Sequence, residues 1–153
     1  LHISKIAIKK LQLNKLMWVV TKKNPLKKKP YLSKAVRIKL SKNMTKKENK
    51  IFVRYFDDKT KSTNTFDLLK YINKKNKNAN LFFLIGADNL KNFYKWKNWL
   101  KVTKLAKIVV FPRQNYSSKF SSKKIYAKIK QKDVIYIKSK KINISSSLIK
   151  KFW

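Results

Sequence analysis

Short apolar runs rich in β-branched and aromatic residues alternate along this chain with segments of helical periodicity. The runs predicted to be strands are Leu16–Val20, Ile51–Phe56, Leu81–Ile85, Ile108–Phe111 and Val134–Ile137. The segments predicted to be helices are Leu1–Leu13, Tyr31–Lys42, Thr65–Asn76, Asp88–Phe93, Trp96–Leu105, Ser122–Lys130 and Ser145–Phe152. This alternation is typical of a parallel sheet, because strands buried on both faces need helices to cover them. We predict an α/β fold with a Rossmann-like, doubly wound parallel sheet and helices on both faces.

The length and the apolar content favour one packed domain over residues 1–153. The chain has no internal repeat and no evident domain boundary, and its 13% aromatic content argues against a disordered tail. Leu1 opens directly into a helical pattern that has no preceding cap, and Trp153 falls inside another. We therefore expect further residues of the natural protein on both sides of this chain.

The charge balance of the chain is strongly positive. It contains 41 Lys and Arg residues against six acidic residues, for a formal net charge of +35. Such a field gathers phosphate groups, whether they belong to ATP, RNA or anionic lipid. Most of the cations are Lys, whereas nucleic-acid grooves usually include Arg, so drift in surface composition is the favoured interpretation. The alternative is a basic nucleic-acid-binding module, in which Tyr55, Phe56, Tyr71 and Phe120 stack on bases.

Several classes of site are excluded by what the chain lacks. It has no Cys and a single histidine, His2, so neither a disulfide framework nor a zinc centre can be assembled from it. With a single glycine, Gly86, it has no Gly-x-Gly-x-x-Gly or Walker motif. No apolar run approaches the roughly 20 residues of a membrane span, and the start does not resemble a secretory signal. We expect a cytoplasmic protein without a membrane partner.

In a doubly wound sheet the ligand lies past the carboxyl ends of the strands. The segments that follow the predicted strands are Thr21–Lys27, Asp57–Thr65, Gly86–Asn89, Pro112–Tyr116 and Ile144–Lys150. We expect the binding residues to come from these segments.

Gly86 and Asp88 follow the apolar run Leu81–Ile85 directly. A glycine at this place indicates either a positive φ or the close approach of a ligand, with a simple strand-to-helix turn equally compatible. The carboxylate of Asp88 is suited to accept hydrogen bonds from ribose hydroxyls, although capping the following helix is the commoner role of such an Asp.

Three aromatic residues, Phe93, Trp96 and Trp99, recur at helical spacing. Such a stripe most often packs into the core, and that is the interpretation favoured from spacing alone. A stacking wall for a flat ring is the alternative.

Two further segments could meet phosphate. Lys27 ends the loop sequence Asn24-Pro25-Leu26-Lys27, where a solvated surface cation is the simpler interpretation. Ser146 and Ser147 stand at the predicted start of the last helix, with Lys150 one turn on. Free N–H groups at such a start bind anions, and ordinary Ser capping fits equally well.

Taken together and in order, these segments resemble the bacterial nicotinate-nucleotide adenylyltransferases. Trp18–Lys27 resembles their strand and Asn-Pro-x-Lys loop, and Thr63–Leu69 resembles their Tyr-Thr-x-Asp-Thr-Leu element. Ile85–Leu90, followed by the Phe93, Trp96 and Trp99 stripe, is similar to their most recognisable segment. Ile144–Lys150 resembles their closing Ile-Ser-Ser-Thr-x-Ile-Arg.

The resemblance implies transfer of AMP from ATP to nicotinate mononucleotide, which gives deamido-NAD and pyrophosphate, with Mg²⁺ held on the ATP phosphates. It implies that Trp96 stacks on the pyridine ring. Thr65 and the backbone N–H groups near Phe66 and Lys97 would recognise the nicotinate carboxylate. Asp88, beside Gly86, would take the ribose hydroxyls.

For the phosphates, the resemblance implies Lys27, Ser146, Ser147 and Lys150. The chain departs from the family in three places: Asn64 stands where Tyr is usual, and Ser147 and Lys150 replace Thr and Arg. The family's opening strand and its His-x-Gly-His motif would lie before Leu1, so we expect no catalytic residue within this chain. A related adenylyltransferase with another acceptor, such as pantetheine phosphate, is an alternative that the flat tryptophan rings favour less.

Overall fold

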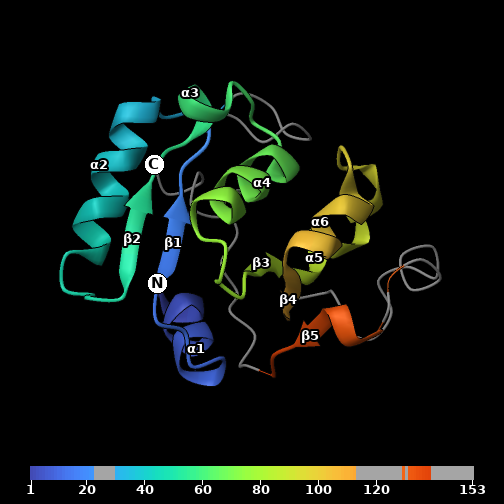
Figure 1. Ribbon diagram of the computed structural model, residues 1–153. Helices are drawn as coiled ribbons and strands as arrows, with labels where there is room; N and C mark the ends of the chain where they lie inside the picture. Colours follow the sequence, from blue (N-terminus) through green and yellow to red (C-terminus); the bar gives the residue numbers. More distant parts are fainter. Residues whose placement is uncertain (23–29, 113–128, 130, 139–153) are drawn as a thin grey trace.

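The computed structural model describes residues 1–22, 30–112, 129 and 131–138 (Figure 1). The helices are α1 (His2–Lys10), α2 (Lys34–Thr45), α3 (Asp57–Thr60), α4 (Thr65–Lys75), α5 (Ala87–Lys91) and α6 (Trp99–Leu105). The strands are β1 (Leu16–Val19), β2 (Ile51–Arg54), β3 (Phe82–Gly86), β4 (Lys107–Phe111) and β5 (Val134–Tyr136). Single 3-10 turns span Phe93–Lys95 and Gln131–Asp133. Each predicted strand is confirmed, with each end within two residues of its predicted position.

All strand pairs in the described part of the chain are parallel. β1 pairs with β2 in the register Leu16 to Ile51. β4 lies between β3 and β5, pairing Ile108 with Phe83 on one side and with Val134 on the other. The described strands thus form a pair and a triplet rather than one continuous sheet, and β1 and β3 are not hydrogen-bonded neighbours.

Helices cover both faces of the β3–β4–β5 sheet. On one face, Val109 and Phe111 of β4 pack with Ala7 of α1 and with Leu16 and Ile51 of the other strand pair. Side chains of α4, α5 and α6 fill the opposite face, where the buried residues are Leu69, Ile85, Ala87, Leu90, Phe93, Val102, Ala106, Ile108, Val110, Ile129 and Val134. Successive β4 side chains therefore enter different cores, as the alternation of a pleated strand requires. The predicted doubly wound α/β architecture is confirmed.

α2 begins three residues later than predicted, because Ser33 caps it. The Ser33 hydroxyl oxygen accepts a hydrogen bond from the Val36 N–H at 3.3 Å. The helix turns Val36, Leu40 and Met44 toward solvent, while Arg37 and Thr45 lie on its inward side. The apolar pattern of this segment therefore does not mark the face that the protein buries.

Left-handed residues explain two helices that are shorter than predicted. Gln12, with φ of 49°, follows α1, which ends at Lys10. Asn98, with φ of 55°, precedes α6, which begins at Trp99 instead of Trp96. Asparagine tolerates this conformation better than most residues because its short polar side chain can bond locally.

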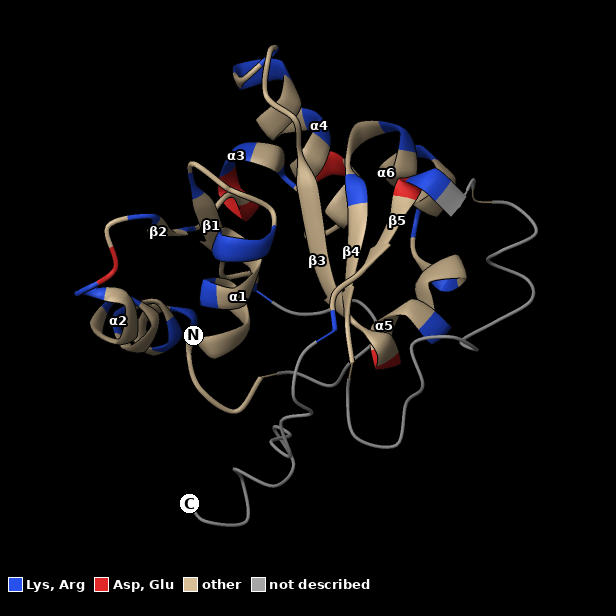
Figure 2. Ribbon diagram, turned by 90° about the horizontal axis from the view of Figure 1, so that it is seen from below, with Lys and Arg blue, Asp and Glu red and all other residues tan. Residues whose placement is uncertain are grey.

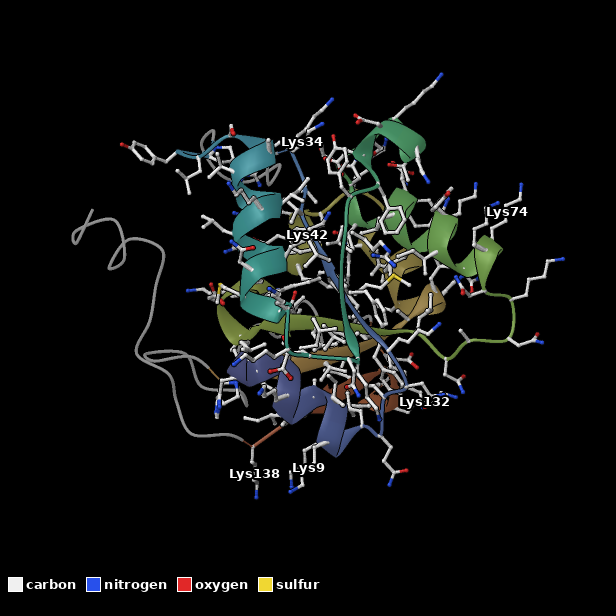
Figure 3. All side chains as sticks on the ribbon, turned by 90° about the vertical axis from the view of Figure 1, so that its left-hand side faces the viewer. Lys9, Lys34, Lys42, Lys74, Lys132 and Lys138 are labelled. Atoms are coloured by element: carbon white, nitrogen blue, oxygen red, sulfur yellow. The ribbon has the colours of Figure 1, made fainter. Side chains whose placement is uncertain are left out.

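The positive charge is not gathered on one face of the described protein. Figure 2 shows Lys and Arg on nearly every element, with Asp and Glu at a few places. The lysines labelled in Figure 3 come from α1, α2, α4 and the region of β5, and they point outward in different directions. This distribution therefore does not resemble the single basic groove that binds a nucleic-acid backbone.

A matched pair of substitutions compares the buried Leu90 of α5 with the exposed Leu40 of α2 in their contribution to the stability of the fold. Leu90→Ala should lower the free energy of unfolding by about 2–4 kcal/mol, because Leu90 is 1% exposed in the core. Leu40→Ala, at a residue that is 46% exposed, should cost less than about 1 kcal/mol. Urea unfolding followed by circular dichroism measures both, and equal losses would contradict this assignment of the core.

Candidate functional site

A pocket of about 770 Å³ opens beyond the carboxyl ends of β1 and β2. Its walls come from the segment after β1, from α3, from the start of α4 and from the segment before α6. They comprise Lys22, Asp57, Asp58, Thr60, Lys61, Ser62, Thr63, Asn64, Asp67 and Lys97. In Figure 1, β1 and β2 run side by side and point toward α3. This is the edge at which parallel α/β sheets bind their ligands.

Asp57 joins the ends of the two strands. It begins α3 directly after β2, is only 7% exposed, and accepts a hydrogen bond from the Lys22 N–H at 2.6 Å. Because the carboxylate is charged, this bond is stronger than one between neutral groups. The bond ties the segment after β1 to the start of α3.

Asp58 stands at the solvent side of the same turn. Its carboxylate accepts a hydrogen bond from the Tyr55 hydroxyl at 2.9 Å and pairs with Lys22 at 3.3 Å and Lys34 at 3.5 Å. The Tyr55 hydrogen bond, together with the two ammonium groups, holds the pKa of the Asp58 carboxyl below its ordinary value. Desolvation, followed by the bond to Asp58, raises the pKa of Tyr55.

The start of α4 is held by Ser62. The Ser62 hydroxyl donates to the Asp67 carboxylate at 2.6 Å and accepts from the Asn64 N–H at 3.1 Å. This arrangement fixes the turn that leads to Thr65 and Phe66 in the first turn of α4. N–H groups at a helix start carry partial positive charge and face whatever lies beyond it.

Lys97 lines the pocket together with Asn64 and Asp67. The fold therefore brings the segment around Lys97 to the start of α4, next to Thr65 and Phe66. Of the predicted carboxylate-binding set, Lys97 lines the pocket, whereas Thr65 and Phe66 follow the lining residue Asn64 in the chain; the role of the set remains a prediction.

The aromatic stripe packs as a cluster of edge-to-face contacts. Phe93 is completely buried, with the rings of Trp96 at 5.4 Å and Trp99 at 5.9 Å between centroids. Trp96 also meets Phe83 at 6.0 Å. The interpretation as core is thus correct for Phe93, while Trp96 and Trp99 stay half-buried.

Gly86 and Asp88 occupy the turn from β3 into α5. Gly86 has φ of −78° and is itself the N-cap residue of α5. This excludes a positive φ as the reason for a glycine, and both a simple strand-to-helix turn and the close approach of a ligand remain compatible with it. Asp88 lies in the first turn of α5 rather than at its cap, and it is half-buried.

Four predicted phosphate-binding residues, Lys27, Ser146, Ser147 and Lys150, lie outside the described residues. The predicted helix Ser145–Phe152 lies outside them too, as does Ser122–Lys130 apart from residue 129. Within residues 1–22, 30–112, 129 and 131–138, no group of His, Cys, Asp or Glu side chains is arranged to hold a metal ion. In the same part of the chain, no helix is long and apolar enough to cross a membrane.

The sequence analysis did not single out Lys22, Asp57, Asp58 or Ser62, although it pointed to the segment that begins at Asp57. The available signal was the pair Asp57-Asp58 directly after a strand, in a chain with six acidic residues. Their partners, however, are set by contacts between distant segments.

Comparison with known proteins defines first the class and then the family. The model of the cytidylyltransferase-like family matches residues 1–152, so the chain belongs to that family. A Pelagibacter ubique protein named "Probable nicotinate-nucleotide adenylyltransferase" is 39% identical over 151 residues, covering 99% of this chain and 83% of that protein. A Clostridium tetani protein of the same name is 30% identical, covering 98% and 77%. Within the class, the chain is therefore a member of the nicotinate-nucleotide adenylyltransferase family.

Solved structures agree on the fold. The Plasmodium falciparum nicotinic acid mononucleotide adenylyltransferase complexed with NaAD superimposes with a TM-score of 0.75 at 18% identity. That match covers 99% of this chain and 77% of the other. The same enzyme complexed with APC gives a TM-score of 0.69 at 20% identity, covering 97% and 75%.

We predict that the Asp58 carboxyl titrates below the ordinary value of 3.8, and that Tyr55→Phe raises its midpoint. Because the folded-state pKa is the lower one, the network adds stability above the unfolded pKa and loses it as the pH falls through the folded pKa. Carboxyl ¹³C NMR titration measures the midpoint, with Tyr94→Phe as the control. A midpoint that Tyr55→Phe leaves in place would refute the hydrogen bond.

Proposed function

We propose that this protein transfers the adenylyl group of ATP to nicotinate mononucleotide in NAD biosynthesis. The observation that carries the proposal is the 39% identity to the Pelagibacter protein across 99% of the chain. The chemistry of the pocket supports it. The three lysines that line the pocket are matched there by three aspartates, so the attraction for an anionic pyridine nucleotide would come from the start of α4 and from the net charge of +35 of the whole chain.

In the proposed reaction, a 5′-phosphate oxygen of nicotinate mononucleotide attacks the α-phosphorus of ATP. The bond from the α-phosphorus to the bridging oxygen breaks, pyrophosphate leaves with that electron pair, and deamido-NAD forms. No covalent enzyme intermediate is needed, so the protein contributes alignment and charge neutralisation. We propose the cytoplasm as the location and residues 1–153 as part of a single nucleotidyltransferase domain.

The acceptor side of the proposed site is formed by described residues. Trp96 would stack on the pyridine ring, while Thr65 and the N–H groups near Phe66 and Lys97 would bind the nicotinate carboxylate. Asp88 would accept hydrogen bonds from the ribose, with Gly86 leaving room for the ligand beside it. The fold holds both side chains in place, because Trp96 packs on Phe93 with 5.4 Å between ring centroids and Asp88 is half-buried in the first turn of α5.

Lys27, Ser146, Ser147 and Lys150 are proposed for the phosphates on the basis of the sequence. Mg²⁺, when bound, would neutralise charge on the ATP phosphates. Among the described residues, no group of His, Cys, Asp or Glu side chains is arranged to hold a metal ion. Among them, the cations that border the pocket are Lys22, Lys61 and Lys97.

Binding of the mononucleotide tests the proposal directly. Calorimetric titration of the chain with nicotinate mononucleotide should show saturable binding. Trp96→Ala should weaken mononucleotide binding by about 5- to 100-fold, the loss expected for one stacked ring. Trp96→Phe should retain part of the affinity.

The control for that experiment is Tyr94→Ala, which removes a neighbouring aromatic ring that is 37% exposed and should leave affinity unchanged. Circular dichroism of each variant checks that the fold is intact. Tight, salt-dependent RNA binding without mononucleotide binding would instead support the nucleic-acid-binding alternative.

A further inference from the structure

Arg37 stands on the inward side of α2, half-buried, in a protein whose cations otherwise face solvent for the most part. Its guanidinium Nη1 donates to the Thr21 carbonyl at 2.7 Å, and its Nη2 donates to the Lys22 carbonyl at 3.1 Å. Its Nε donates to the Leu32 carbonyl at 3.2 Å. Thr21 and Lys22 follow β1, and Leu32 lies just before the cap of α2. One side chain therefore holds both ends of the connection from β1 to α2.

Only arginine can make this set of contacts. The three nitrogen atoms of a planar guanidinium point their N–H groups in fixed, diverging directions, so separate carbonyls can be reached at once. A lysine ammonium at the same place is a single compact group and would reach fewer of them. Neutral carbonyls that bond to a charged donor also gain more than they would from a neutral one.

The same peptide group is held from its other side. Between Thr21 and Lys22, the carbonyl oxygen accepts from Arg37, while the N–H donates to the buried carboxylate of Asp57 at 2.6 Å. The cation lies at the negative end of the peptide dipole and the anion at its positive end. The peptide group thus lies between a cation, Arg37, and an anion, Asp57, and is hydrogen-bonded to both.

Lys22, which supplies the N–H of this peptide group, belongs to the pocket wall. Lys22 and Asp57 both line the pocket that also contains Asn64 and Lys97. Movement of the segment after β1 would change the width of the pocket between these walls. Arg37, which does not line the pocket, is therefore placed where it can set the shape of the ligand site through the segment that it holds.

We infer that Arg37 and Asp57 are positioning residues for mononucleotide binding, which hold the Thr21–Lys22 peptide group as a fixed wall of the pocket. This inference rests on the proposed function. When the wall is already ordered before binding, no conformational entropy is lost in ordering it as the ligand binds. Loss of this order therefore weakens the affinity.

Arg37→Lys keeps the charge and removes the planar fork. It should weaken binding of nicotinate mononucleotide by roughly tenfold, because the wall is no longer pre-ordered. Arg54→Lys is the matched control. Arg54 donates to the carbonyl of its own neighbour, Val53, at 3.0 Å and does not line the pocket, so its replacement should leave affinity unchanged.

Asp57 provides a second and separate test. Asp57→Asn retains an oxygen that can accept from the Lys22 N–H and should keep most of the affinity, whereas Asp57→Ala should lose it. Combining Arg37→Lys with Asp57→Ala should weaken binding by less than the product of the two single effects, because both act on one peptide group. A purely structural role would lower the urea midpoint and leave affinity below that midpoint unchanged.

Hydrogen exchange of the Lys22 amide measures, in the absence of ligand, how firmly its hydrogen bond to Asp57 is held. We expect slow exchange in the wild-type protein and in Asp57→Asn, and faster exchange in Asp57→Ala and Arg37→Lys. Folded Arg37→Lys and Asp57→Ala variants with wild-type affinity and wild-type exchange would overturn the inference. A wild-type chain that binds no mononucleotide would overturn the proposed function and, with it, the role of Arg37 and Asp57 in binding. If that chain still shows the expected exchange pattern, the hydrogen bonds to the Thr21–Lys22 peptide group stand.

Discussion

Burial of β4 on both of its faces is the interaction on which the rest of the structure depends. Ile108, Val109, Val110 and Phe111 are between 0 and 2% exposed, and their side chains enter two different cores. A strand buried in this way needs helices on both sides and neighbours at both edges. The parallel order then places the carboxyl ends of the strands at one edge, with Gly86 at the end of β3 and Asp88 two residues further on.

The few acidic residues have a structural meaning in this lysine-rich protein. Asp57, Asp58 and Asp67 all line the pocket, and each accepts a hydrogen bond from a named partner nearby. Their carboxylates fix backbone and side chains at the start of α3 and α4. In the proposed enzyme they would shape the site, while the surrounding lysines attract the phosphates of its substrates.

The hydrogen bonds of Arg37 give α2 a role that its apolar residues do not suggest. The outward Val36, Leu40 and Met44 add little to the core, whereas the inward Arg37 connects the helix to the end of β1. Besides packing against β2, the helix thus places one polar side chain at the end of β1. This position matters because it decides where a pocket wall stands.

The sequence by itself determined the strands, their parallel class, the family and two of the segments that line the pocket, Thr21–Lys27 and Asp57–Thr65. It did so because apolar runs report burial and because Thr63–Leu69 and Ile85–Leu90 keep the family pattern. Lys27, Ser146, Ser147 and Lys150 stay predictions from that pattern alone. Only the tertiary structure decided the capped start of α2, the φ of Gly86 and the hydrogen bonds to the Thr21–Lys22 peptide group. The Lys22 to Asp57 bond joins residues 35 apart, and no local periodicity encodes a contact that exists only once β1 and β2 have paired.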